Sequence, residues 1–106
     1  MQITVTGRQI NVDETLRDYA QTRLGSGVGK YFDGAMVGHI AFSREGPLYR
    51  TDIQVRVGRG MAWESHAENA DIQISFNSAV EHLEKRLRRH KRKRRDYNRG
   101  RDRTVE

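Results

Sequence analysis

The alternation of hydrophobic and polar residues at the start of the chain predicts a strand and then a helix. Ile3 and Val5 fall on one face of residues 2–6 and threonines fall on the other, as in a half-buried strand. Asp13 stands where a helix cap is expected, because its carboxylate can accept from the free N–H groups of a first turn. The apolar stripe of that helix follows at three- and four-residue spacing, at Leu16, Tyr19, Ala20 and Leu24.

Three glycines within residues 25–29 predict that this first helix loosens or breaks. Each glycine costs about 1 kcal/mol relative to alanine in a helix interior. Apolar residues continue the helical rhythm to Phe32, so we expect a weakened final turn that ends at Asp33-Gly34. The Gly-Ser-Gly of residues 25–27 lacks the Gly-Lys-Ser/Thr ending of a phosphate-binding loop and does not follow a strand, so we expect no nucleotide site there.

Residues 36–44, 49–57 and 61–68 alternate with period two, and they predict three consecutive strands. Short turns at residues 45–47 and 58–60 make these strands an antiparallel meander. The middle strand places threonine and β-branched residues on one face and charged or amide residues on the other. We therefore expect a sheet with one apolar and one wet face. Trp63 is expected in the core rather than on the surface as a base-stacking platform.

One apolar stripe predicts a last helix, capped by Asp71, that runs from the sheet into a basic segment. The stripe consists of Ile72, Phe76, Ala79, Val80, Leu83 and Leu87, and no apolar residue follows it until Tyr97. The helix is expected to pass the edge of the sheet as a solvated, basic extension. The element order predicts an α+β two-layer sandwich, β-α-β-β-β-α, with both helices on one face of a four-stranded sheet. We expect residues 1–95 to form this domain and residues 96–106 to be a disordered polar tail.

The formal net charge of +6 comes from one segment of the chain. Residues 1–84 carry eight Lys or Arg against eleven Asp or Glu, residues 85–95 carry nine Lys or Arg, and residues 96–106 carry three of each sign. Such a segment in a small domain favours a polyanionic partner, with nucleic acid ranked before an anionic membrane. Residues 88–96 contain no apolar side chain to insert into a bilayer, so we expect no membrane partner.

Composition and spacing give no basis for a catalytic or metal site. The chain of 106 residues has no cysteine, which excludes disulfides and thiolate metal ligands and fits a cytoplasmic protein. Glu64, His66 and Glu68 lie in a row about 6–7 Å apart along a strand, which is too spread for one ion without further ligands. We expect no enzyme, no cofactor, no metal and no small-molecule substrate.

Four stretches of the chain resemble the hibernation-promoting factor and protein Y family. They are QITVTGRQINVDETLRDYAQTRL at the start, KYFDG after the first helix, the A-E-x-x-D before the last helix, and the ending L-x-K-R-L-R-R-H-K-R-K-R-R. The resemblance covers residues 1–95 and implies a fold similar to double-stranded-RNA-binding domains. It also implies a bacterial protein that binds the small ribosomal subunit between head and body, over the mRNA and tRNA sites, in stationary phase or stress.

The resemblance assigns RNA binding to the basic end of the last helix. The positions that match the family pattern are Lys85, Arg89, His90, Lys91, Lys93 and Arg95, and those that add charge beside them are Arg86, Arg88, Arg92 and Arg94. On the first helix, Arg23 and Lys30, together with Arg17, are secondary contact candidates. Arginine can fork onto phosphate oxygens, while lysine acts as a point charge.

These patterns and the resemblance predict a ribosome hibernation factor that inhibits translation by binding small-subunit rRNA in the mRNA/tRNA channel. The alternative is a general structured-RNA-binding module without ribosomal specificity, which would bind isolated duplexes as tightly as ribosomes. Long members of the family continue through a linker into a second domain that pairs two ribosomes. This sequence stops at Glu106, so we do not expect ribosome pairing by this chain alone.

Overall fold

The computed structural model describes residues 2–31, 36–57 and 60–105, with the backbone alone for residues 91–105. Its elements follow one another as β1 (Gln2–Gly7), α1 (Glu14–Gly29), β2 (Met36–Glu45), β3 (Leu48–Val57), β4 (Met61–Asn69) and α2 (Ile72–Val105). The predicted order of strands and helices is confirmed, and each predicted strand has its counterpart here.

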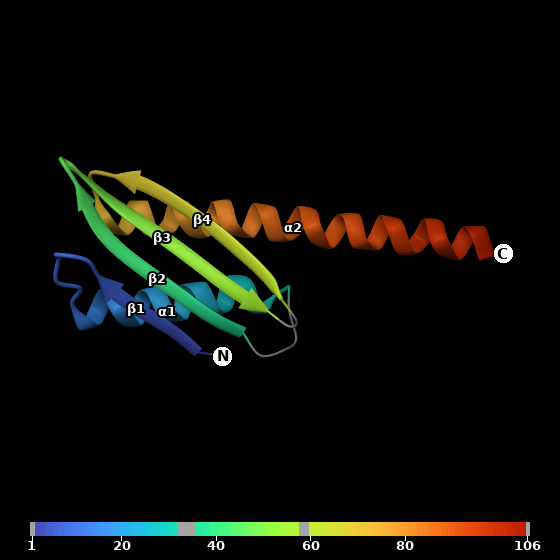
Figure 1. The fold of residues 1–106 in the computed structure, drawn as a ribbon, viewed down its shortest axis with the longest axis horizontal. Coiled ribbons are helices and arrows are strands. Elements are labelled where there is room, and N and C mark those ends of the chain that lie inside the picture. The colour runs from blue at the N-terminus through green and yellow to red at the C-terminus, as the bar shows by residue number, and fades with distance from the viewer. Residues whose placement is uncertain (1, 32–35, 58–59, 106) are drawn as a thin grey trace.

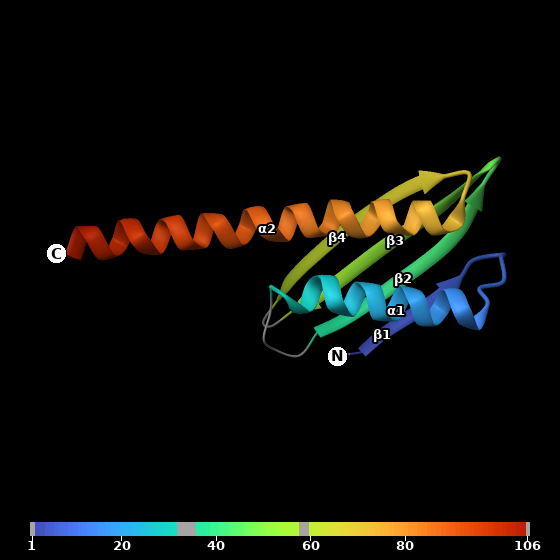
Figure 2. The same cartoon turned by 180° about the vertical axis from the view of Figure 1, so that it is seen from behind.

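The four strands form one mixed sheet in the order β1-β2-β3-β4. β1 pairs with β2 in parallel, an arrangement that needs a crossover such as α1 between the two strands. β2, β3 and β4 pair antiparallel, with Ile40 opposite Ile53 and Val55 opposite Trp63. Both helices lie on one face of the sheet and leave the other face open, as the sequence predicted (Figures 1 and 2).

The core lies between the sheet and the two helices. Its largest fully buried apolar side chains are Phe42, Phe76, Leu24, Ile40, Ile53, Leu83 and Leu87. Two buried hydroxyl contacts also join the sheet to α2: Thr51 Oγ1 lies 2.7 Å from Ser75 Oγ, and Ser65 Oγ donates to the Ala79 carbonyl at 2.8 Å. Each hydroxyl thus keeps a partner inside the core, where an unpaired one would be costly.

Both helices begin at the predicted caps. Asp13 accepts the N–H of Leu16 at 2.7 Å, and Asp71 accepts two N–H groups of the first turn of α2. The turn between β2 and β3 places Gly46 at a φ of 60°, a left-handed conformation that favours glycine. Local side-chain chemistry therefore sets these boundaries.

The predicted break at the glycines of α1 is wrong, because the helix continues without interruption through residues 25–29. Leu24, just before this stretch, and Val28, within it, are fully buried. Burying one such side chain contributes about 1.5–3 kcal/mol, which offsets the intrinsic cost of the glycines. Gly27 packs against α2, where an added Cβ would stand 2.5 Å from Oε1 of Glu84. The predicted helix end at Asp33-Gly34 lies outside the described residues.

α2 extends well past the sheet. Leu87 is its last buried side chain among those that the structure describes, and the helical backbone continues from there to Val105. Figure 1 shows this part projecting from the body of the domain. The backbone is thus helical through residues 96–105, where the sequence predicted a tail without fixed structure; the domain boundary at residue 95 stays a prediction. Among the described residues, no helix is long and apolar enough to cross a membrane.

Replacing Gly29 by alanine is expected to stabilise the domain. Gly29 is helical and exposed, and its φ is not positive, so alanine fits its backbone. We expect the free energy of unfolding to rise by about 0.5–1 kcal/mol, because the unfolded chain loses freedom, and urea denaturation measures this change. Gly27→Ala is the matched variant: its Cβ would displace the Glu84 carboxylate from Arg23, so we expect a smaller gain or none. Equal gains at both positions would contradict a role for Gly27 in the helix contact.

Candidate nucleic-acid interface

The apolar stripe of α2 fixes which way its basic residues point. Because Leu83 and Leu87 are fully buried, the predicted contact residues at positions 85, 86, 88 and 89 fall on the outer faces of the helix. The exposed ones are Lys85, Arg86, Arg88 and Arg89, and His90 is half-buried. The side chains of Lys91, Arg92, Lys93, Arg94 and Arg95 lie outside the described residues, although their backbone continues the helix.

Four side chains of α2 form one wall of an open hollow beside β4. His82, Lys85, Arg86 and Arg89 lie within about 100° of one another around the helix, and they line the hollow together with Ser65 and His66 of β4. Its volume is about 350 Å³, and no carboxylate is among its described lining residues. Lys85 and Arg89 have no hydrogen-bond or ion-pair partner among the side chains that the structure describes. We call this surface the cationic hollow.

Two side chains of α2 also close the outer edge of β4. Arg86 Nη1 donates to the carbonyl of Glu64, and His82 Nδ1 lies 3.3 Å from the carbonyl of His66. A carbonyl only accepts, so Nδ1 of His82 carries the proton in this contact. Arg86, predicted from the sequence as an RNA contact, is therefore already engaged within the fold.

α1 closes the opposite edge of the sheet in the same way. Arg17 donates to the carbonyl of Val5 at 3.0 Å, and Gln21 donates to the carbonyl of Ile3 at 3.1 Å. On each helix the two donor residues are four apart, and on the facing strand the two acceptor residues are two apart. This spacing matches because four residues of a helix and two residues of a strand each advance about 6 Å. These contacts satisfy carbonyls that an edge strand otherwise offers to another chain.

Arg23 joins the two helices instead of facing solvent alone. Its guanidinium donates two hydrogen bonds to the Glu84 carboxylate, at 3.1 and 3.2 Å, and the two side chains are 33% and 12% exposed. The hydrogen bonds to Glu84 raise the pKa of Arg23. Lys30, another of the three α1 candidates, is exposed at the end of the helix. Lys30 is therefore more accessible than Arg23.

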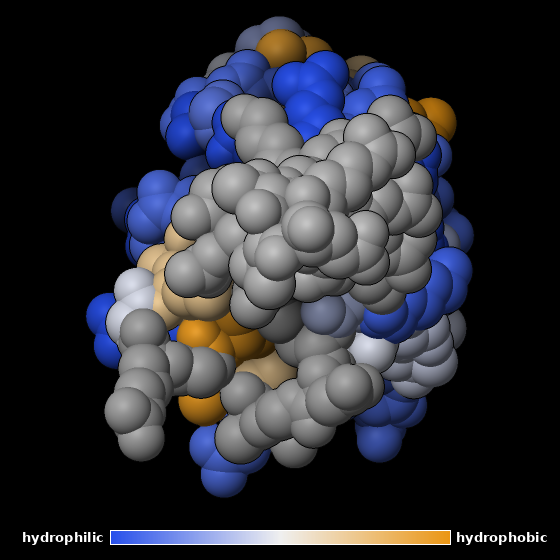
Figure 3. All heavy atoms as spheres, turned by 90° about the vertical axis from the view of Figure 1, so that its right-hand side faces the viewer, coloured by the Kyte–Doolittle hydropathy of each residue, from blue (hydrophilic) through white to orange (hydrophobic). Residues whose placement is uncertain are grey.

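Arg88 and His90 contact the body of the domain where α2 leaves it. Arg88 donates a hydrogen bond to Tyr31, and this bond raises the pKa of Arg88. His90 makes a T-shaped contact with Trp63, with ring centroids 5.0 Å apart. Trp63 is half-buried and packs against the core, in line with its predicted place. Figure 3 views this end of the molecule and shows hydrophilic residues over most of the described surface, with a small apolar patch.

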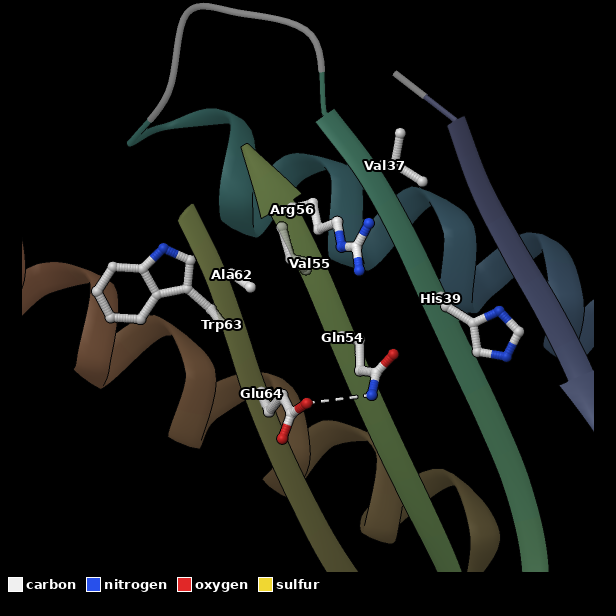
Figure 4. A pocket seen from close by; sticks show the side chains of 8 residues that line it. All are labelled: Val37, His39, Gln54, Val55, Arg56, Ala62, Trp63 and Glu64. Carbon is white, nitrogen blue, oxygen red and sulfur yellow. Dashed lines mark hydrogen bonds between the residues drawn. The ribbon is translucent and has the colours of Figure 1, made fainter. Parts of the chain in front are cut away.

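The open face of the sheet carries charges of both signs, some of which form ion pairs. Arg50 pairs with Asp52 at 3.1 Å and with Glu68 at 3.3 Å, and its hydrogen bonds to Asp52 raise the pKa of Arg50. Gln54 donates to Glu64 at 3.1 Å (Figure 4). Within the described ranges, no three metal-ligating side chains converge. This face therefore lacks the run of like charge that α2 carries.

His66 and His82 belong to the cationic hollow, and sequence reasoning missed both. A signal was present for His82, which precedes Lys85, Arg86 and Arg89 by three, four and seven residues and so shares their helix face. No sequence signal pointed to His66, because its approach to these residues depends on how α2 packs along β4.

The family model described as "Sigma 54 modulation protein / S30EA ribosomal protein" matches residues 3–95. The ribosome hibernation promotion factor of Bradyrhizobium diazoefficiens is 34% identical over 91 residues, which cover 86% of this chain and 45% of that protein. Its namesake in Rhizobium meliloti is 28% identical over 100 residues, 94% of this chain and 53% of that protein. The chain thus spans about half the length of these two relatives. The ribosome hibernation promoting factor of Escherichia coli K12 is 24% identical over 91 residues, 86% of this chain and 94% of that protein.

Two solved structures are similar to this chain. The N-terminal domain of Thermus thermophilus Protein Y has a TM-score of 0.76 at 28% identity, covering 85% of this chain and 99% of that one. A ribosomal subunit interface protein from Coxiella burnetii has a TM-score of 0.74 at 22% identity, covering 86% and 98%. The second likeness shows the fold alone.

Breaking the pair of Arg23 and Glu84 is expected to lower stability without altering the cationic hollow. Glu84→Gln leaves the half-buried guanidinium of Arg23 without its carboxylate. We expect the free energy of unfolding to fall by about 1 kcal/mol, below the usual loss for a charged hydrogen bond, because solvent screens an Arg23 side chain that is a third exposed. Urea denaturation of Glu84→Gln, Arg23→Met and the double variant gives the coupling free energy. A coupling near zero would mean that the contact between the helices rests on apolar packing alone.

Proposed function

The chain belongs to the Sigma 54 modulation protein / S30EA ribosomal protein family, and we propose that it is a ribosome hibernation factor that binds small-subunit rRNA through α2. The observation that carries the proposal is the cationic hollow, where Lys85 and Arg89 lie beside His66 and His82 with no carboxylate among the described lining residues. Relatives named ribosome hibernation promotion factor support the ribosome as the partner.

Binding depends on neutralised phosphates. Each lysine or arginine that meets a phosphate releases condensed counterions, so affinity falls as salt rises. Lys85 and Arg89 are one helical turn apart, about 6 Å along the axis, so the two side chains meet neighbouring phosphates. The basic residues 91–95 continue on the same helix beyond the sheet and extend the contact along the RNA.

The bound domain inhibits translation by steric exclusion of mRNA and tRNA. In the channel between the head and body of the small subunit, the domain takes the place of mRNA and tRNA. Shape and backbone contacts suffice to recognise a structured RNA site, so no base readout is needed. The mechanism requires no cofactor, and the ribosome as partner places the protein in the cytoplasm.

Co-sedimentation with separated ribosomal subunits across a salt series tests this proposal. We expect saturable binding to the small subunit near one to one. The double variant Lys85→Ala/Arg89→Ala is expected to bind more weakly and to make the slope of log affinity against log salt shallower by roughly 1.5. The control Arg8→Ala/Arg56→Ala removes the same charge from residues that line the hollows of the open sheet face, so affinity should change little.

Three outcomes would contradict the proposal. Unsaturable binding to both subunits and to any RNA duplex would favour the general RNA-binding module. Equal losses in the hollow variant and in the control would mean that net charge, and not the hollow, drives binding. Binding to the small subunit that tRNA does not compete away would place the site outside the channel.

A further inference from the structure

The described side chains of α2 make their last contacts with the domain at residues 88–90. Leu87 is the last buried apolar residue among the described side chains of the helix. Beyond it, the sequence offers no apolar side chain until Tyr97, so no hydrophobic docking is available to residues 88–96. Among the described side chains, those of this turn are therefore the ones that can fix the direction in which the basic helix leaves the sheet.

Trp63 holds one side of that turn through His90. The two rings meet at a centroid distance of 5.0 Å and an interplanar angle of 69°. Trp63 sits opposite Val55 in the register of β3 and β4 and packs against the core, which fixes its position. Figure 4 shows it reaching from β4 toward the side of α2. An anchored indole therefore supports the imidazole.

The burial of the ring nitrogens in this contact indicates that the His90 ring packs against the domain and does not face RNA. Nε2 of His90 and Nε1 of Trp63 are both buried, and neither has a hydrogen-bond partner among the residues that the structure describes. Nε2 of His90 cannot reach a phosphate while its ring rests on Trp63. His90 is also not among the residues that line the cationic hollow, where Lys85 and Arg89 lie.

Tyr31 holds the opposite side of the same turn through Arg88. Residues 88 and 90 are about 200° apart around the helix, so their partners stand on opposite sides of it. Tyr31 follows the cap of α1, donates its N–H to the Val28 carbonyl at 3.0 Å, and packs against the core. Its hydroxyl accepts a hydrogen bond from Arg88. Because this contact is exposed, it contributes less to holding the helix than the ring packing of His90 does.

We propose that Tyr31, Trp63, Arg88 and His90 form a collar that fixes the direction of the projecting basic helix, and that His90 and Arg88 are positioning residues in place of phosphate contacts. The part of this proposal that concerns RNA rests on the proposed function. A helix without packing partners is only marginally ordered. A fixed exit direction lowers the entropic cost of laying its charges along an RNA groove, and that gain is lost when the collar opens.

Substitutions of His90 separate positioning from phosphate contact. His90→Phe keeps a ring on Trp63 and removes the polar nitrogens, whereas His90→Ala removes the ring. We expect His90→Ala to lower affinity for the small subunit roughly three- to tenfold, with an unchanged salt slope, and His90→Phe to restore it. A phosphate contact predicts the opposite: both variants would weaken binding alike, because neither keeps the ring nitrogen that would donate to the phosphate. That second pattern would overturn the proposal.

Tyr31→Phe tests the other side of the collar without altering charge. It removes the hydroxyl that accepts from Arg88 and leaves the guanidinium in place. We expect a smaller loss of affinity than for His90→Ala, again with an unchanged salt slope. If Arg88 instead binds phosphate, freeing it from Tyr31 would leave affinity the same or raise it, and the role of Arg88 in the collar would fall.

A measurement without RNA tests the collar by itself. The chain has no cysteine, so Thr22→Cys on α1 and Asn98→Cys on the projecting part of α2 give two unique sites for spin labels. We expect a narrow distance distribution in the parent and in His90→Phe, and a broader one in His90→Ala, with red-shifted emission of the single tryptophan. Equal widths in all three variants would overturn the collar. A narrow parent distribution without ribosome binding would instead leave the collar standing and refute only the proposed function.

Discussion

The docking of α2 against the sheet is the interaction on which the rest of the structure depends. Phe76 is its central contact, since its ring meets Tyr19 of α1 at a centroid distance of 5.7 Å and Phe42 of β2 at 6.0 Å. One α2 side chain thus ties together both helices and the sheet. The same stripe of buried residues fixes the rotation of α2 about its axis, and this rotation turns Lys85 and Arg89 toward the β4 side. Packing in the core therefore determines where the positive charge of the chain is presented.

The elements could be predicted from the sequence because the signals for them are local. Strand alternation, the caps Asp13 and Asp71 and the stripe of α2 each depend on residues close together in the chain, and each is confirmed. The break at residues 25–29 was wrong because helix propensity does not include the burial of Leu24 and Val28 or the contact of Gly27 with α2. Tertiary packing outweighed a local preference there.

The sequence predicted where the candidate site lies, but it did not predict which of its cations are free and which have partners within the fold. A run of nine Lys or Arg in eleven residues marks residues 85–95, but nothing in the run says which cations have partners. The structure engages Arg23 with Glu84 and Arg86 with the Glu64 carbonyl, while Lys85 and Arg89 line an open hollow. These distinctions arise from pairings 22 and 61 residues apart in sequence, which no periodicity encodes.

The two closed sheet edges have a consequence for the behaviour of the protein at high concentration. The donors that close the edges sit on the same two helices that cover the apolar face of the sheet. Undocking of α2 would therefore bare the carbonyls of β4 and the buried face of the sheet together, which is the combination that seeds intermolecular β-sheet aggregation. The more free energy the undocking of α2 requires, the more strongly the protein is therefore expected to resist aggregation. Any ligand that binds α2 only in its docked position would therefore also protect the chain from aggregation.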